Sequence, residues 1–207
     1  MFINGREIAE KYREFFPLPE RFDPGSVKQA CYDLRIGSEV FLSQDRIPLR
    51  LTEEDPYFTL APGQFALLQT YEQVRVPREY VALISIRVTY KFQGLINISG
   101  FHVDPTYEGH LLFAVQNVGP NDIRLKFKEP AFMIMWACLR SPYEGPVRKK
   151  GYDRIPLELM AQLGGPSVTL VSLQKRVEEL SLKLTIYGGF ALAAFLLVLG
   201  LVLKSIL

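Results

Sequence analysis

The sequence predicts a mainly β globular domain, a barrel or sandwich, followed by a coiled-coil stalk and one transmembrane helix. Short β-branched and aromatic runs between turn signals fill residues 26–139, with no helical pattern between them. Close to the last residue lies an uncharged apolar run, and apolar residues at heptad spacing lead into it. These observations divide the 207 residues into an N-terminal helix and lead-in (1–25), a β-barrel (26–140), a basic arm and linker (141–166), a stalk (167–185) and a transmembrane helix (186–204).

The first element is a short helix, because Ile8, Tyr12, Phe15 and Phe16 recur at helical spacing before Pro17. The strands follow, and the clearest of them are residues 30–37, 81–86, 110–115, 123–127 and 131–139. Gly- and Pro-containing turn signals separate them at residues 61–63, 119–122 and 128–130. After residue 140 the chain reads as an irregular arm that carries Arg148, Lys149, Lys150, Tyr152 and Arg154.

The apolar run is residues 186–203, eighteen residues without a charge, which cover roughly 27 Å of hydrocarbon as a helix. Lys183 and Lys204 bracket it, and Tyr187 stands where an interfacial aromatic ring is expected. More basic residues precede the run than follow it, which favours a cytoplasmic globular domain. We therefore expect a single-pass C-terminal membrane anchor. The alternative is a buried core helix.

Between the arm and the anchor, residues 164–167 break the chain with two glycines and a proline. Apolar residues then alternate in steps of three and four, at Leu170, Leu173, Val177, Leu180, Leu184, Tyr187, Ala191 and Ala194. This heptad spacing predicts parallel self-association, and Gly189 with Ala193 offers a second, small-residue packing face. A solitary amphipathic stalk is the alternative.

The composition, 48% hydrophobic and 22% charged, is that of a folded protein and excludes disorder. Cys31 and Cys138 are too few for a disulfide framework, and adding His102 and His110 does not make a thiolate zinc site, so we expect no protein-bound metal. A net charge of +2 gives no reason to expect a nucleic-acid partner. P-loop, dinucleotide-binding, hydrolase and zinc-protease signatures are missing, and a zinc-type deaminase would need more cysteines.

Three groups of polar residues remain as candidates for function. Asp33 shares one face of an alternating strand with Arg35, and the alternative is a solvated strand face. Arg87 and Thr89 place a guanidinium and a hydroxyl together at a strand end, which suits phosphate oxygens, although a surface ion pair is equally compatible. Asp104 precedes a proline turn, and the aromatic ring that follows three residues later can cover a sugar face while the carboxylate orients water or a hydroxyl.

Taken in order, these segments resemble the dCTP deaminase and dUTPase superfamily. The resemblance rests on A-C-Y-D-L-R-I-G, L-A-P-G-Q-F-A-L-L-Q-T-Y-E-Q-V-R-V-P, I-R-V-T-Y-K-F-Q-G-L, V-D-P-T-Y-E-G-H-L and Q-N-V-G, and it covers about residues 26–139. It implies a jelly-roll β-barrel that forms a homotrimer, with a pyrimidine deoxynucleotide in each inter-subunit cleft. It implies no other cofactor than Mg²⁺ on a bound triphosphate.

The resemblance also assigns roles to individual residues. Arg87 would contact phosphate, Thr89 would take one of two motif-two serine positions, Asp104 would hold water or the 3′-hydroxyl as the catalytic residue, Tyr107 would lie against the deoxyribose, Gln116 would join the nucleotide-binding set, and Asp33 would be a structural or metal-side carboxylate.

Departures from the family pattern limit the expected chemistry. Ala114 stands where deaminases have the glutamate that moves protons between water and the cytosine ring, and losing a general acid/base costs roughly 10²–10⁴ in rate. Val88 replaces the first motif-two serine, Glu129 brings a negative charge toward the phosphates, and Ile134 replaces a phosphate-contacting glutamine. The glycine-rich closing tail of dUTPases is missing after Leu139.

We therefore expect a membrane-anchored homotrimer that binds a pyrimidine deoxynucleotide, with deaminase chemistry weak or lost. One alternative is an active enzyme tethered to the bilayer, catalysing metal-free dCTP deamination or dUTP pyrophosphate hydrolysis. Another is a structural trimerisation platform with empty clefts.

Overall fold

The computed structural model describes residues 1–45, 47–147, 151–163 and 170–206. The chain forms two compact units, Met1–Ser167 and Val168–Leu207.

The globular unit begins with two short helices, α1 (Gly5–Glu10) and α2 (Tyr12–Phe15), and two single 3-10 turns, Pro19–Arg21 and Pro24–Ser26. Asn4 caps α1 by accepting a 3.0 Å hydrogen bond from the Glu7 amide. Phe15 is fully buried with its ring centroid 4.6 Å from that of Trp136. The predicted N-terminal helix is thus confirmed, although it is divided at Lys11.

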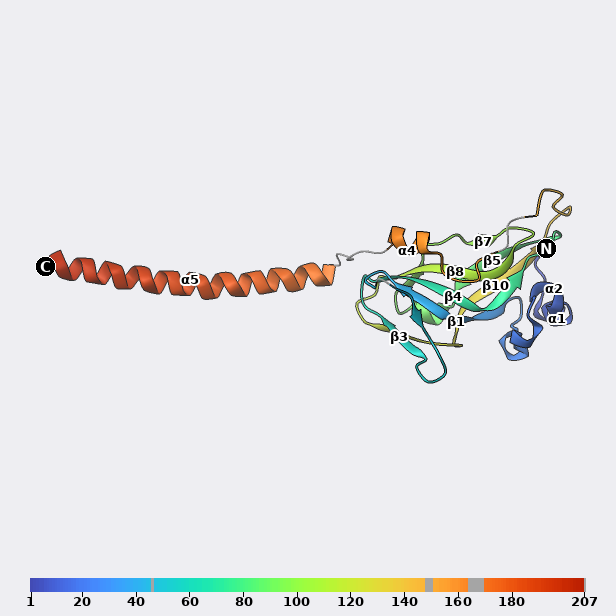
Figure 1. Ribbon diagram of the computed structural model, residues 1–207, viewed down its shortest axis with the longest axis horizontal. Coiled ribbons are helices and arrows are strands. Elements are labelled where there is room, and N and C mark those ends of the chain that lie inside the picture. The colour runs from blue at the N-terminus through green and yellow to red at the C-terminus, as the bar shows by residue number, and fades with distance from the viewer. Residues whose placement is uncertain (46, 148–150, 164–169, 207) are drawn as a thin grey trace. The chain divides into compact units, whose positions relative to one another are not determined.

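The rest of the globular unit is mainly β, as predicted (Figure 1). The strands are β1 (Tyr32–Leu42), β2 (Leu49–Arg50), β3 (Tyr57–Leu60), β4 (Phe65–Arg75), β5 (Tyr80–Ile86), β6 (Leu95–Asn97), β7 (His102–Val103), β8 (Glu108–Asn117), β9 (Ile123–Lys126) and β10 (Pro130–Cys138). An antiparallel sheet runs in the order β6-β8-β4-β1-β10-β5-β7, with β2 added beside β1, and β3 pairs with β9 separately. The sheet curls around one core.

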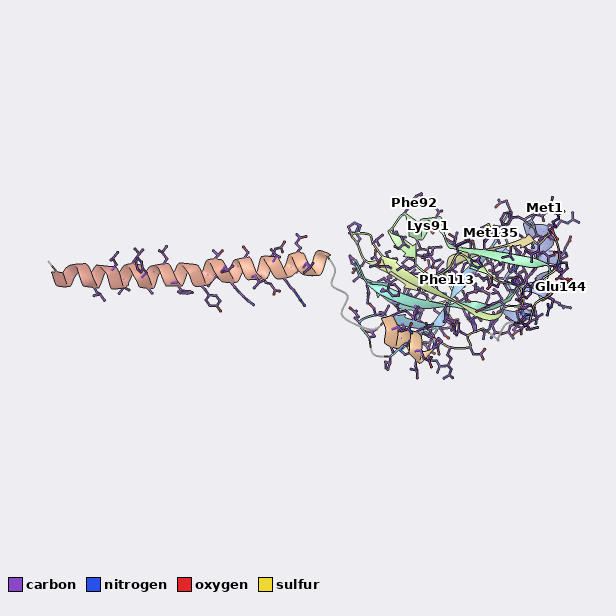
Figure 2. All side chains as sticks on the ribbon, turned by 90° about the horizontal axis from the view of Figure 1, so that it is seen from above. Met1, Lys91, Phe92, Phe113, Met135 and Glu144 are labelled. Atoms are coloured by element: carbon purple, nitrogen blue, oxygen red, sulfur yellow. The ribbon has the colours of Figure 1, made fainter. Side chains whose placement is uncertain are left out.

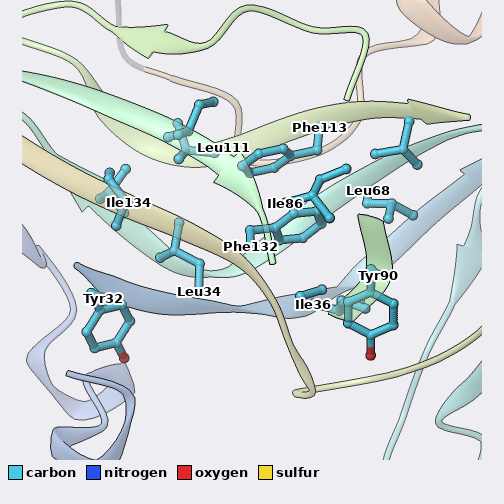
Figure 3. Packing of buried hydrophobic residues seen from close by; sticks show 14 of the residues in the cluster. Tyr32, Leu34, Ile36, Leu68, Ile86, Tyr90, Leu111, Phe113, Phe132 and Ile134 are labelled. Atoms are coloured by element: carbon cyan, nitrogen blue, oxygen red, sulfur yellow. The ribbon is translucent and has the colours of Figure 1, made fainter. Parts of the chain in front are cut away.

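The core is built by alternation along the strands, because successive side chains point to opposite faces of a sheet. In β8 the residues Leu111, Phe113 and Val115 are buried, whereas Leu112 and Ala114 between them face outward and are only partly covered. The rings of Phe113 and Phe132 stack at the centre of the core with centroids 3.9 Å apart (Figure 3).

Two segments depart from the sequence-based expectation. The prediction of strands throughout residues 26–139 was wrong at α3 (Val88–Lys91), a one-turn helix that follows β5 directly. The arm predicted to be irregular contains α4 (Leu157–Leu163), whose Met160 is buried. Neither helix is long enough to show several turns of apolar periodicity, so neither gave a clear signal in the sequence.

The second unit contains α5 (Leu170–Ile206). Within it, Leu173–Leu197 is long and apolar enough to cross a membrane, with a mean hydropathy of 1.7. The predicted linker at residues 164–167 lies outside the described residues. The stalk and the apolar run are one continuous helix, and self-association of the stalk stays a prediction.

Candidate functional site

A cavity of about 430 Å³ opens beside β7 and β8. Its polar lining includes His102, Asp104, Tyr107 and Tyr152, and Leu111 and Leu112 supply apolar walls. The residues come from β7, the turn after it, β8 and the segment that precedes α4. The structure therefore brings Asp104 and Tyr107 together, as the sequence predicts.

Asp104 is presented by the turn that joins β7 to β8. The Thr106 amide donates to the carbonyl of Val76 at 2.7 Å, and Thr106 adopts a left-handed backbone conformation with φ of 70°. His102 lies beside the carboxylate, with Nε2 3.3 Å from Asp104 Oδ1, and both side chains are about half exposed. A carboxylate next to an imidazole can orient water or a sugar hydroxyl and accept its proton.

Tyr107 is held against the chain segment that precedes α4. Its hydroxyl donates to the His110 carbonyl, and a Cβ atom on Gly151 would lie 2.6 Å from the Tyr107 hydroxyl. The Gly151 amide donates to Glu108 at 2.6 Å, and the His110 amide donates to Tyr152 at 3.3 Å. Because of this pairing, Gly151 and Tyr152 form a wall of the cavity. Sequence analysis missed this role, because it depends on a close approach between segments that are distant in the sequence.

Arg87 is placed elsewhere in the same chain. It precedes α3, and its Nε lies 3.4 Å from Asp33 Oδ2 while Nη1 donates to the Pro130 carbonyl at 3.3 Å. Arg87 follows β5 directly and is not among the residues that line the cavity, whereas Ile84, three residues earlier in β5, lines it. Thr89 is exposed on α3. A single chain therefore does not bring Arg87 and Thr89 to the cavity that holds Asp104.

Asp33 does not lie on a solvated strand face, so that interpretation was wrong. The residue is 4% exposed, and burial raises the pKa of its carboxyl although Arg87 and Lys28 act in the opposite direction. Arg35 on the same face pairs at 2.6 Å with Glu72, whose pKa is also raised by burial. Both carboxylates are bound to cations of the fold, which suits a structural role for Asp33.

Ala114 faces outward from β8 and lies under α4. Together with Leu112 it packs against a cluster formed by Phe41, Leu67, Ile155 and Met160, in which Ile155 and Met160 are 5% and 7% exposed. The methyl group therefore sits in an apolar contact. Gln116, two residues further along β8, donates from its side-chain amide to the Gly63 carbonyl at 3.3 Å, and it does not line the cavity.

Metal-binding capacity is limited in the described part of the chain, where no three His, Cys, Asp or Glu residues form a group that could hold an ion. Among the described residues that line the cavity, Asp104 is the one that carries a carboxylate. Mg²⁺ prefers substrate phosphates and water together with one or two carboxylates. The residues present therefore fit an ion that arrives bound to a triphosphate.

Comparisons with known proteins identify the family of the chain. The family model described as dCTP deaminase-like matches residues 2–129, more than half of the chain. A dCTP deaminase of Pyrococcus horikoshii is 30% identical over 129 residues, 62% of this chain and 80% of its own length. A dUMP-forming dCTP deaminase of Methanosphaera stadtmanae is 29% identical over 120 residues, 58% of this chain and 59% of its own length.

The fold is also similar to a solved structure. The crystal structure of 2′-deoxycytidine 5′-triphosphate deaminase from Agrobacterium tumefaciens superimposes with a TM-score of 0.54 at 13% identity. The similarity covers 65% of this chain and 48% of that one, so the chain spans about half of that structure's length. With a curled sheet of this kind and a family match over residues 2–129, the chain belongs to the dCTP deaminase-like family.

Proposed function

We propose that this protein is a membrane-anchored homotrimer that binds a pyrimidine deoxynucleotide and does not deaminate it. The observation that carries the proposal is Ala114, a methyl group that packs beside α4 at the position where the resemblance described above expects the deaminase glutamate. A methyl group moves no proton, and Ala114 packs in part against the apolar cluster that includes Met160.

The cavity supports the choice of ligand. Asp104 can hold a sugar hydroxyl, and the rings of Tyr107 and Tyr152 give flat apolar faces for a deoxyribose or a base. The curated relatives that match the chain are dCTP deaminases. A pyrimidine deoxynucleotide is the ligand class that agrees with both observations.

A trimer would complete this site. Arg87 and Thr89 do not line the cavity of their own chain, and in a trimer they would contact a nucleotide in the cavity of a neighbouring copy. Exposed apolar side chains follow α3 and precede β7, including Phe92 at 87%, which Figure 2 labels, and Phe101 at 68%. Packing between copies would cover these rings, since exposed apolar patches commonly mark interfaces.

The anchor would hold the trimer on the cytoplasmic face of a bilayer. Leu173–Leu197 supports a membrane span by length and hydropathy, and exposed Val177, Leu180 and Leu184 at heptad spacing support parallel packing of the helices. Three C-terminal helices gathered near one axis suit a trimeric globular part.

The test is calorimetry on the full chain in detergent micelles. We expect saturable heat with at least one of dCTP, dUTP and dTTP, and no ammonia release from dCTP. Asp104→Ala should remove the heat, whereas Asp122→Ala in an exposed turn should keep it. Silence for all three nucleotides, or steady ammonia release, would overturn the proposal.

A second candidate is dUTP pyrophosphate hydrolysis, which does not need the glutamate. The close approach of His102 to Asp104 favours it, because the pair can accept a proton from water. Measuring pyrophosphate and ammonia in the same samples separates the two: pyrophosphate release that Asp104→Ala abolishes supports hydrolysis.

A further inference from the structure

Residues 151–155 cross the outer face of three neighbouring strands. Gly151 and Tyr152 pair with β8, as described above, and the Asp153 carbonyl accepts a 2.9 Å hydrogen bond from the Gln69 side chain of β4. The Ile155 amide then donates to Glu39 Oε2 of β1 at 3.0 Å. We call residues 151–155 the crossing segment.

Helix α4 fixes the far end of this crossing segment by apolar contact. Met160 is buried, and Leu159 and Leu163 are partly buried in the same cluster. Leu157, the first residue of α4, is 76% exposed. The contact between α4 and the sheet involves only a few side chains. We therefore expect the free energy needed to detach α4 to be small compared with the free energy of global unfolding.

The near end of the crossing segment belongs to the cavity. Gly151 and Tyr152 line it, and Leu112 lies both in the cavity wall and in the cluster that α4 covers. The docking of α4 and the shape of the cavity therefore both depend on the crossing segment and on the Leu112 side chain.

We infer that Ile155 and Met160 are positioning residues that act as a clasp: by holding α4 on the sheet they fix Tyr152 as a wall of the nucleotide cavity. This rests on the proposed function. By linkage, nucleotide in the cavity stabilises docked α4 to the same extent that docked α4 stabilises nucleotide.

The first experiment needs no ligand and uses the full chain in lipid nanodiscs. Hydrogen–deuterium exchange is followed in residues 151–163 for the native protein, Met160→Asp and the matched control Leu157→Asp at the exposed first residue of α4. We expect Met160→Asp to speed exchange in both α4 and the crossing segment by about tenfold or more, and Leu157→Asp to leave it unchanged. Native exchange at residues 151–155 in Met160→Asp would overturn the clasp.

The second experiment adds dCTP, dUTP or dTTP. Saturating nucleotide should slow exchange in α4, which does not line the cavity, and Met160→Asp should weaken binding by about tenfold, with Met160→Leu restoring it. Glu39→Ala, which removes the acceptor of the Ile155 amide from the sheet side, should act in the same direction and does not depend on the stability of α4 itself. Native affinity in Met160→Asp and Glu39→Ala, or unchanged α4 exchange on binding, would overturn the inference. If the native chain binds none of the nucleotides, the proposed function fails, and the ligand-free exchange alone decides the clasp.

Discussion

Position 114 is the residue on which the proposed loss of deamination depends. A glutamate there would bring a carboxylate beside Met160 and its apolar neighbours, and such contacts disfavour a charge. The sequence accordingly combines a small residue on β8 with an apolar helix above it. Introducing a glutamate at position 114 while α4 stays in place should therefore not restore deaminase activity.

We therefore predict that Ala114→Glu gives no ammonia release from dCTP. It should also destabilise the protein by about 1–3 kcal/mol, because the contact with α4 must open to hydrate the charge. Ammonia assays and urea unfolding check both parts, and Ala114→Gln separates the effect of charge from that of size. Deaminase activity in Ala114→Glu would show that α4 does not occlude this position.

His110 provides a test of pH dependence. It is 7% exposed, its Nδ1 lies 2.7 Å from the Thr70 carbonyl, and burial lowers the pKa of its imidazole below the ordinary value of about 6.5. Between that ordinary value and the lower folded value, the unfolded chain binds more protons than the folded chain. The contribution of the neutral imidazole to stability is therefore complete above about pH 6.5 and is lost as the pH falls through this window.

We predict that the difference in free energy of unfolding between the native protein and His110→Gln changes with pH in that direction. The native protein should lose stability relative to the variant as the pH falls from about 7.5 to about 5.5. Urea unfolding at intervals across this range measures it. Taking the difference removes the contributions of Asp33 and Glu72, whose raised pKa values act with the opposite sign. Parallel profiles would mean that His110 is not desolvated in the folded protein.

At the scale of elements, the pairing of the crossing segment with β8 depends on a glycine. A Cβ atom at Gly151 would meet the Tyr107 hydroxyl at 2.6 Å and the Glu108 carbonyl at 2.9 Å, and the backbone oxygen cannot move aside easily. Gly100 lines the same cavity, and a Cβ atom there would meet nothing within 4 Å. The two glycines therefore form a matched pair for mutation.

We predict that Gly151→Ala lowers nucleotide affinity and destabilises the fold by about 1–3 kcal/mol, because the crossing segment must move away from β8. Gly100→Ala should leave both quantities near native values. Calorimetric titration and thermal unfolding compare the variants. Equal affinities in the two would place the ligand away from Tyr107 and Tyr152.

At the scale of the whole molecule, the described residues include two exposed apolar surfaces. One surrounds α3 and β6 in the globular unit, and the other follows the heptad positions of α5. The proposed trimer would cover both, since exposed apolar surfaces commonly pack between copies.

We predict that Leu180→Asp shifts the full chain in detergent from trimer to smaller species in sedimentation equilibrium, because a carboxylate at a heptad position opposes packing. Leu182→Asp is the control, since Leu182 is 63% exposed against 59% for Leu180 but lies off the heptad. Equal effects of the two substitutions would favour a solitary stalk. A native chain that is monomeric would leave Arg87 without a nucleotide to contact.

Much of the fold could be predicted because its signals are local. Strand alternation, turn residues and the long apolar helix are each visible within about ten to twenty neighbouring residues, and β5, β8, β9 and β10 appear where the sequence places them. The helices α3 and α4 were missed because one or two turns carry too little periodicity. Of the site, Asp104 and Tyr107 could be predicted because they flank one turn.

The sequence by itself determined the mainly β class, the apolar C-terminal helix and the identity of the polar residues available for chemistry. Only the tertiary structure decided that Asp33 is buried between cations, that α4 covers Ala114, and that Gly151 and Tyr152 close the cavity beside Tyr107. The reason is physical: periodicity records which face of an element is apolar, whereas burial of a given side chain depends on which distant segment packs on it, and that is fixed only when the chain folds.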